Sequence, residues 1–404
     1  MRTAVTTTLA LIASIHAQQP PPSTTFKSGT ELVLVDFVVS DKSDHPVAGL
    51  SINDFAVKED GNTRPIVSFQ AFGVGAVAAS GSGATNDPGH AATPVPEAPL
   101  TPSADASTIL VVDDGHLSLA EAGRLRPALK ELLTKVGKRQ GAFMLVAPVS
   151  MISVLGVLPG NAAALSAVVD QIVGHRIDDT EYPIAEAEAY AIVRGDREVL
   201  QRVTGRFVTM HPETPPAEAE AVAHERANDV AHDATLRRET LFRAVLSCLD
   251  WLAPRPGRHS LILASGGFAR DQYDSQYDEV VTRSLRANAP IHFLDARGLG
   301  GFSPYSSAEY SAPLTRKTDE GPFGRYDAAE GSTVLADDTG GLTIGNTNNL
   351  ERGLERLLDT MTTYYILAYQ PPEHVKSGFH KIKVEVHGKG LTVRARRGYF
   401  SGGH

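Results

Sequence analysis

Two adjacent carboxylates follow directly on an uninterrupted apolar run of this 404-residue chain. The run covers residues 108–112, and Asp113, Asp114, His116 and Ser118 come after it. Carboxylate and hydroxyl oxygens are the ligands that Mg²⁺ prefers, and a histidine nitrogen shifts the preference toward Mn²⁺ or Zn²⁺. This stretch therefore offers the donor atoms for a divalent cation.

The residues around this stretch indicate where those side chains lie in a fold. An apolar run without a polar break is typical of a strand that is buried on both faces of a parallel sheet. Ser118 and Glu121 have the spacing of a helix-capping box. The sequence therefore predicts a strand, an acidic loop and a helix. In open α/β sheets, ligands bind at the carboxyl ends of the strands.

The same residues also have a purely structural interpretation. Asp113 and Asp114 can cap nearby backbone groups, Ser118 can serve only as the N-cap of the helix, and His116 can be solvated. The sequence leaves both hypotheses open, a cation site and a structural turn.

Strands and helices alternate through residues 108–361, which predicts an α/β domain with a doubly wound, mostly parallel sheet of Rossmann-like type. The expected strands are 108–112, 142–149, 151–158, 260–264 and 291–294. The expected helices are 119–136, 161–173, 183–193, 198–207, 215–252, 277–288 and 350–361. Residues 298–331 are rich in Gly, Ser, Pro and Tyr, and are expected to be a loop insertion in this domain.

Two flanking segments have the pattern of β-strands. Residues 26–73 and 362–404 contain runs with period-two alternation bounded by turn residues. We expect them to form one small β-sandwich module, with strands of the tail pairing with the strand at 31–40. Residues 74–107 hold almost no large apolar side chains, which predicts a flexible linker.

Composition excludes several classes of protein. A formal net charge of −9 and the lack of a basic stripe argue against nucleic-acid binding. No phosphate-binding loop or dinucleotide fingerprint is present, so the sequence carries no nucleotide signal. The single cysteine, Cys248, rules out an intrachain disulfide and lies in an apolar helical stretch, where we expect it to be buried.

The N-terminus predicts export. Arg2 precedes an apolar run, and Ala17 precedes a polar, proline-rich stretch, which is the layout of a secretory signal peptide at residues 1–17. No later run has the apolar length of a transmembrane segment. We therefore expect a secreted or periplasmic protein.

Four stretches together resemble a known family. They are VVDDGHLS at 111–118, PGRHSLILASGGF at 256–268, IHFLDARGL at 291–299 and RRGYF at 396–400. With the TGG at 339–341, they resemble the exported von Willebrand factor A-related proteins of the acidobacterial type. The resemblance runs from about residue 26 to residue 400, outside the linker and the insertion, and implies a von Willebrand A-like fold.

That resemblance also implies a place for a cation. The A-type fold often holds one through an Asp-x-Ser-x-Ser turn, a Thr from a second loop and an Asp from a third. Counted from Asp113, the serine positions fall on Gly115 and Leu117; counted from Asp114, they fall on His116 and Ser118. The third loop has Ser265 in place of Asp. The predicted site is thus a degenerate one for Mg²⁺ or Mn²⁺, with these candidate ligands: Asp113, Asp114, His116, Ser118, Thr180 and Ser265.

The function predicted from these features is binding of a protein partner, as an exported adhesive scaffold. The sheet edge carries acids and loops, yet the sequence holds no complete catalytic set, so we do not expect an enzyme. Ser265-Gly266-Gly267, for example, is not a nucleophile elbow. Two alternatives stand beside this prediction: a metal-dependent hydrolase that uses Asp113, Asp114 and His116, and an inert structural component of the cell envelope.

Overall fold

A computed structural model describes most of the chain after residue 31. The described residues are 32–73, 106–138, 141–177, 179–255, 259–269, 275–298, 327–345, 349–372 and 377–401. The predicted signal peptide, residues 74–105 of the predicted linker and residues 299–326 of the predicted insertion lie outside them.

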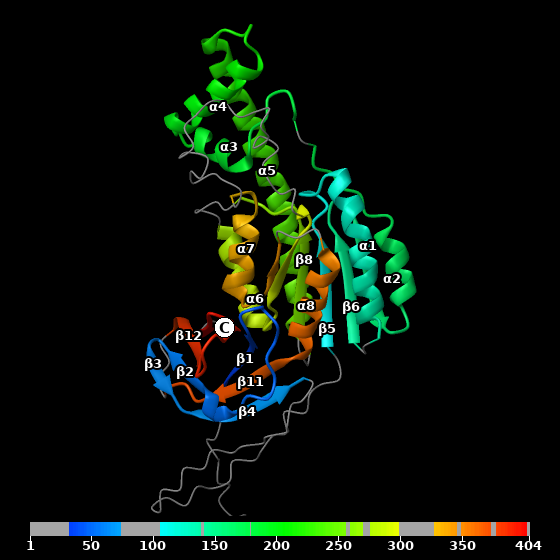
Figure 1. Ribbon diagram of the computed structural model, residues 1–404, viewed down its shortest axis with the longest axis vertical. Helices are drawn as coiled ribbons and strands as arrows, with labels where there is room; N and C mark the ends of the chain where they lie inside the picture. The colour runs from blue at the N-terminus through cyan, green and yellow to red at the C-terminus, as the bar shows by residue number, and fades with distance from the viewer. Residues whose placement is uncertain are drawn as a thin grey trace, which may run out of the picture. The chain divides into compact units, whose positions relative to one another are not determined.

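The largest sheet has six strands in the order β10-β9-β8-β5-β6-β7 (Figure 1). Its strands are β5 (Ala106–Val112), β6 (Gly141–Ala147), β7 (Ile152–Leu158), β8 (His259–Ser265), β9 (Ile291–Asp295) and β10 (Thr343–Ile344). Every neighbouring pair is parallel except β6 and β7, which form an antiparallel hairpin. The prediction of a mostly parallel sheet is confirmed, as is the strand pair expected at 142–158.

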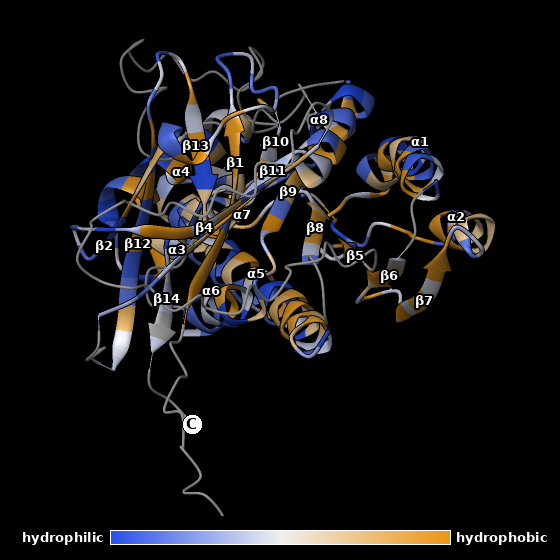
Figure 2. Ribbon diagram, turned by 90° about the horizontal axis from the view of Figure 1, so that it is seen from below, coloured by the Kyte–Doolittle hydropathy of each residue, from blue (hydrophilic) through white to orange (hydrophobic). Residues whose placement is uncertain are grey.

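Helices cover both faces of this sheet (Figure 2). On one face lie α1 (Leu119–Val136), α2 (Ala162–Val169) and α8 (Leu350–Thr362), which pack on Leu110 and Val112 of β5. On the other face lie α6 (Ser275–Ala287), α7 (Asp327–Thr339) and the end of α5 (Pro216–Leu252), which pack on Ile109 and Val111. Alternate side chains of one strand therefore enter two different cores, which explains why β5 has an uninterrupted apolar sequence.

An all-helical insertion follows α2 and precedes β8. It consists of α3 (Glu186–Val193), α4 (Arg197–Met210) and the N-terminal half of α5. Alanines spaced four residues apart on α5, such as Ala219, Ala223 and Ala227, are buried against the other two helices. Small side chains at this spacing let the helices approach closely. The long helix is continuous over 37 residues.

The flanking segments form two four-stranded antiparallel sheets. One has the order β13-β1-β11-β4 and the other β14-β12-β2-β3; a short 3-10 helix (Ile52–Asp54) precedes β2. The strands are β1 (Val33–Ser40), β2 (Phe55–Glu59), β3 (Asn62–Arg64), β4 (Ile66–Phe72), β11 (Tyr364–Tyr369), β12 (Gly378–Val386), β13 (Thr392–Ala395) and β14 (Gly398–Ser401). β1 pairs with β11 and with β13, so the predicted pairing of the tail with the strand at 31–40 is confirmed.

An aromatic cluster fills the space between these two sheets. Phe37 of β1 and Phe55 of β2 lie edge to face with ring centroids 5.0 Å apart, and Tyr365 of β11 stacks on Phe37. Strands from both ends of the chain contribute to the same core, which supplies the apolar burial that neither segment has alone.

Cys248 is buried in α5 at 4% exposure, as predicted. Burial raises the pKa of its thiol to about 12, so it stays protonated and unreactive at neutral pH. Within the described ranges, no helix combines the length and apolar character needed to cross a membrane.

Candidate functional site

The sheet changes winding direction at β5. The chain passes from β5 to β6 on one side, whereas β8 lies on the other side and leads outward to β9 and β10. In doubly wound sheets, the carboxyl ends of the strands at such a switch point form the usual ligand crevice. Asp113 follows β5 here, and Ser265 is the last residue of β8. The sheet topology therefore indicates the loop that begins at Asp113 as a candidate site, as the sequence pattern did.

Asp113 is the centre of a buried polar cluster. Its carboxylate accepts a hydrogen bond from Ser265 Oγ at 2.6 Å and lies 2.8 Å from His116 Nδ1. Ser265 Oγ in turn accepts the backbone N–H of Gly267 at 2.9 Å. The three residues are at most 2% exposed. The structure therefore brings together Asp113 and His116, which follow β5, and Ser265, which ends β8 and lies 152 residues after Asp113.

His116 has one ring nitrogen engaged and one without a described partner. Nδ1 faces the Asp113 carboxylate, whereas Nε2 is buried and has no hydrogen-bond partner within the described part of the chain. Burial favours the neutral ring, but the charge and hydrogen bond of Asp113, aided by Glu186, outweigh it and raise the pKa of His116. The interpretation of His116 as a solvated side chain was wrong, because the ring is only 1% exposed.

Residues from distant elements cover this histidine. The Phe268 ring lies with its centroid 6.3 Å from that of His116. Arg237 of α5 lies near Gly115: a Cβ added to Gly115 would be 3.7 Å from Cγ of Arg237. Arg237 also forms an ion pair with Glu186 of α3 at 2.9 Å. The helical insertion and the loop after β8 therefore enclose the acidic loop.

Asp114 serves a different purpose from its neighbour. Its carboxylate accepts the backbone N–H groups of Val149 and Ser150, at 3.0 and 2.6 Å, in the turn between β6 and β7. Its carbonyl accepts the N–H of His175 at 2.9 Å. Ser150 Oγ and His175 Nε2 are 3.3 Å apart. Asp114 thus ties the acidic loop to two other loops at the carboxyl edge of the sheet, as the structural interpretation of the acids predicts.

Ser118 is the N-cap of α1. Its hydroxyl accepts the Glu121 N–H, and the Glu121 carboxylate accepts the Ser118 N–H, so the predicted capping box is confirmed. Arg176 donates to the other Glu121 oxygen at 3.1 Å and to the carbonyl of His116 at 2.8 Å. These bonds fix the segment after α2 against the acidic loop.

The structure does not bring Thr180 to the other candidates. Thr180 is exposed, and its neighbour Asp179 pairs with Arg226 of α5 at 2.6 Å. Arg226 lies about three turns, roughly 16 Å, along α5 from Arg237, which is the residue that approaches Gly115. The loop that holds Thr180 is therefore anchored to the helical insertion.

The candidate ligands do not fit a divalent cation in this arrangement. Mg²⁺ requires an open octahedral set of oxygens, but Asp113 is engaged by a histidine and a serine, and Asp114 by two backbone amides. The Ser118 hydroxyl belongs to the helix cap. Among the residues that the structure describes, no three acidic, histidine or cysteine side chains are grouped to hold a metal ion.

Large apolar side chains are exposed on the segments that lie next to the acidic loop, and we call them the carboxyl-edge rim. Met151 is 91% exposed and Ile177 is 93% exposed, on the two loops that Asp114 joins. The full rim consists of Leu119, Val149, Met151, Val173 and Ile177. The sequence interpretation above did not identify this surface. Met151 and Ile177 could have indicated it, because each is a large apolar residue in a segment that connects elements of the sheet domain.

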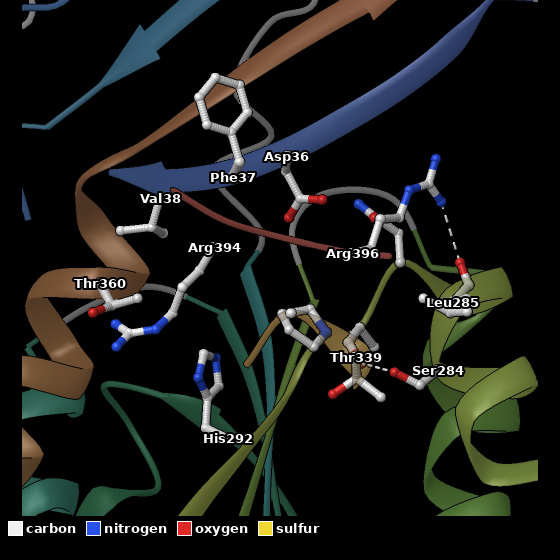
Figure 3. A pocket seen from close by; sticks show the side chains of 14 residues that line it. Asp36, Phe37, Val38, Ser284, Leu285, His292, Thr339, Thr360, Arg394 and Arg396 are labelled. Carbon is white, nitrogen blue, oxygen red and sulfur yellow. Dashed lines mark hydrogen bonds between the residues drawn. The ribbon is translucent and has the colours of Figure 1, made fainter. Parts of the chain in front are cut away.

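A small cavity lies at the other end of the sheet, between β1, β13 and the start of β9 (Figure 3). Its volume is about 20 Å³, which suits a water molecule or two. Arg396 donates to the carbonyls of Leu34 and Leu285, and Arg394 pairs with Asp44 at 3.1 Å. Because these arginines bond protein groups, the cavity is part of the packing between the sandwich and the α/β domain.

Comparisons with known proteins give little guidance. No family model matches this sequence, and none of the curated proteins does. Among solved structures, the open conformation of the pilus adhesin SpaC from Lactobacillus rhamnosus GG is similar with a TM-score of 0.32 and 8% identity. The match covers 87% of this chain and 48% of that one, so the chain spans about half the length of the adhesin structure. A similarity this low supports no conclusion about fold or function.

Proposed function

We propose that this protein binds a protein partner through the carboxyl-edge rim and acts as an exported scaffold of adhesive type. One observation carries the proposal: Met151 and Ile177 are almost fully exposed, on loops that Asp114 and Arg176 hold in place. Grouped apolar side chains on a protein surface commonly mark an interaction site, because water contact with them is unfavourable.

The loops of the rim are fixed, which favours specific binding. Asp114 accepts two amides of the β6–β7 turn, and Arg176 clamps the segment after α2 to the carbonyl of His116. A Cβ on Gly174 would collide with the Ser118 carbonyl, so this segment lies directly against the start of α1. A preorganised surface binds with a smaller loss of conformational entropy than a mobile one.

The von Willebrand A-like identity of the α/β domain and the export of the protein belong to this proposal. The first is supported by the switch point with an acidic loop after β5 and by the motifs quoted above. The second is supported by the N-terminal pattern of residues 1–17. Under this proposal the acidic loop is a scaffold for the rim, and the remnants of a cation motif are used for internal hydrogen bonds.

No observation favours the hydrolase alternative. A general base or metal ligand must reach its substrate, but Asp113 and His116 are enclosed by Phe268 and the helical insertion.

Site-specific photocrosslinking in cells that make the protein tests the proposal. A photoreactive residue at Met151 or Ile177 should yield a discrete higher-mass adduct, whereas the same residue at Leu236, a half-exposed position on α5, should not. Asp114→Ala should abolish the adduct at Met151 by releasing the β6–β7 turn. Absence of an adduct at both rim positions, or an equal adduct at Leu236, would contradict the proposal.

A further inference from the structure

Three side chains of the β-sandwich are hydrogen-bonded in series, a carboxylate to an imidazole to a hydroxyl. Asp60 Oδ2 lies 2.8 Å from His380 Nδ1, and His380 Nε2 lies 2.9 Å from Ser401 Oγ. This order of groups at these distances is the arrangement in which a serine hydroxyl becomes a nucleophile. His380 is 320 positions from Asp60 and 21 from Ser401, so no local pattern in the sequence indicates the set.

The strands of the sandwich explain how these residues meet. β12 has alternate residues buried, His380 among them. β14 pairs with β12 so that Tyr399 lies opposite His380, and Ser401 is two residues further along β14, on the same face as Tyr399. Asp60 lies in the turn between β2 and β3, and its backbone N–H donates to the Lys381 carbonyl at 2.9 Å. His380 is therefore held between the turn that carries Asp60 and the strand that carries Ser401.

The hydrogen bonds set the direction of proton donation along the series. Asp60 Oδ1 accepts the backbone N–H of Lys381 at 2.8 Å, and this bond, together with the bond to His380, lowers the pKa of Asp60. An ionised carboxylate can only accept, so His380 donates from Nδ1, and a neutral ring then accepts the Ser401 hydroxyl at Nε2. The Tyr399 ring stacks on the imidazole with ring centroids 5.2 Å apart, which restrains the plane of the base.

Burial differs along the series in a way that suits this chemistry. The His380 side chain is only 9% exposed, so its orientation is fixed by the groups around it, whereas the Asp60 side chain is 48% exposed. Ser401 is half-buried, so a small molecule can reach its hydroxyl from solvent. An ester fits such a site, because its alcohol leaves once one proton is supplied, and the imidazole can supply it.

We propose that Asp60, His380 and Ser401 form an esterase site for small carboxylic esters. Ser401 Oγ attacks the carbonyl carbon while His380 Nε2 takes the hydroxyl proton; the bond between that carbon and the alcohol oxygen then breaks, and the alcohol leaves with the proton from Nε2. Water attacks the acyl-serine and gives a proton to Nε2, and the carboxylic acid leaves as Ser401 Oγ takes that proton back. Asp60 contacts no substrate and is a positioning residue, which holds the ring and stabilises its protonated form.

The esterase site is separate from the two sites already described. It shares no residue with the acidic loop or with the carboxyl-edge rim, so it is not the metal-dependent hydrolase considered above, and it does not depend on the proposed function. Ser401→Ala should leave the crosslinked adduct at Met151 unchanged. The failure of one proposal can therefore be told from the failure of the other.

A fluorophosphonate probe tests whether Ser401 is a nucleophile, because it bonds covalently to an activated serine hydroxyl. The full chain should gain the mass of one probe, and peptide mass spectrometry should place it on Ser401. Ser247 is the internal control: it is exposed on α5, its hydroxyl donates to the Arg243 carbonyl, and it should stay unlabelled. No label on Ser401, or equal labelling of Ser247, would overturn the proposal.

Hydrolysis of p-nitrophenyl acetate tests the other two residues. Ser401→Ala and His380→Gln should each lower kcat/KM by about 10²–10⁴-fold, since they remove the nucleophile and the general base. Asp60→Asn keeps the turn, because asparagine tolerates the positive φ of 49° at this position, and it should lower kcat with KM unchanged.

Ser247→Ala is the matched control for these variants and should hydrolyse the ester at the parent rate. A circular dichroism melt of each variant shows whether it is folded. A parent that hydrolyses the ester no faster than free imidazole, or a folded Ser401→Ala or His380→Gln with the parent rate, would contradict the esterase site. An Asp60→Asn variant that raises KM alone would remove Asp60 from its positioning role.

Discussion

Asp113 and Glu59 are both buried carboxylates with hydrogen-bond donors around them, one at the sheet edge and one in the sandwich. Glu59 of β2 is 1% exposed and receives Arg64 Nε at 3.0 Å, Tyr399 Oη at 2.6 Å and Tyr369 Oη at 3.4 Å. Burial together with the Glu59 charge raises the pKa of Tyr369, so this hydroxyl stays a donor. The sandwich cluster has an arginine to balance its carboxylate.

The Asp113 cluster is balanced differently. Its donors are Ser265 and His116, and the second ring nitrogen of that histidine has no described partner. Both clusters stabilise the fold. Arg64 always neutralises the charge of Glu59, whereas His116 neutralises the charge of Asp113 only when its ring is protonated. A buried acid at the carboxyl edge of a parallel sheet is therefore not a ligand site by position alone, because its hydrogen-bond partners decide whether its oxygens are free.

Replacing Asp113 should have the largest effect on stability. Asp113→Ala leaves His116 and Ser265 buried without their acceptor, and loss of one partner from a buried pair costs about 3–5 kcal/mol. Urea unfolding monitored by circular dichroism measures this loss. Asp170→Ala is the control, because Asp170 forms an exposed ion pair with Lys130 and should cost less than about 1 kcal/mol. Equal losses in the two variants would contradict the structure of the cluster.

Replacing Glu59 should have a smaller effect. Arg64 is about one-quarter exposed, so in Glu59→Ala it can turn to water, and the two tyrosine hydroxyls are what remains unsatisfied. We expect a loss of about 2–3 kcal/mol in the free energy of unfolding. Both variants should be measured by urea unfolding under the same conditions. A larger loss of free energy of unfolding for Glu59→Ala than for Asp113→Ala would contradict this ranking.

The pH dependence of stability should differ between the clusters, because only one contains a histidine. The pKa of His116 is raised in the folded state, so its stabilising contribution is complete below the unfolded pKa of about 6.5. It is lost as pH rises through the folded pKa. The free energy of unfolding of the parent should thus exceed that of His116→Gln most near pH 5–6, and the difference should shrink at higher pH. The total decrease should be about 1.4 kcal/mol for each pH unit by which the folded pKa of His116 exceeds its unfolded pKa. An advantage that grows with pH would contradict this sign.

Divalent cations should have the smallest effect. The donors of the acidic loop are engaged internally, so Mg²⁺ or Mn²⁺ added to chelated protein should leave the melting temperature unchanged. A rise that disappears in Asp113→Asn would show instead that the loop rearranges to accept a cation.

Local pattern was sufficient to predict much of the fold. The apolar run before Asp113, the capping box at Ser118 and the period-two strands of the two flanks all appear as expected. These features depend on residues within a few positions of one another, or on a strand's need to bury a face.

The state of the site could not be predicted in this way. His116 is buried because Phe268, Glu186 and Arg237 approach it from elements 70 to 152 residues later in the chain. Asp114 is engaged because the turn after β6 lies beside it. The way in which distant elements pack against the acidic loop decides the burial of His116 and the hydrogen bonds of Asp114. No spacing between residues in the sequence specifies that packing. The position of Thr180 depends in the same way on how its loop attaches to α5.

The unbroken course of α5 has a mechanical consequence. Its C-terminal half is packed on the sheet, and its N-terminal half carries α3 and α4. A helix of 37 residues is about 55 Å long and has no hinge unless hydrogen bonds break. The half of α5 that carries α3 and α4 therefore cannot bend independently of the half that packs on the sheet, and Arg237, beside Gly115, lies between the two halves.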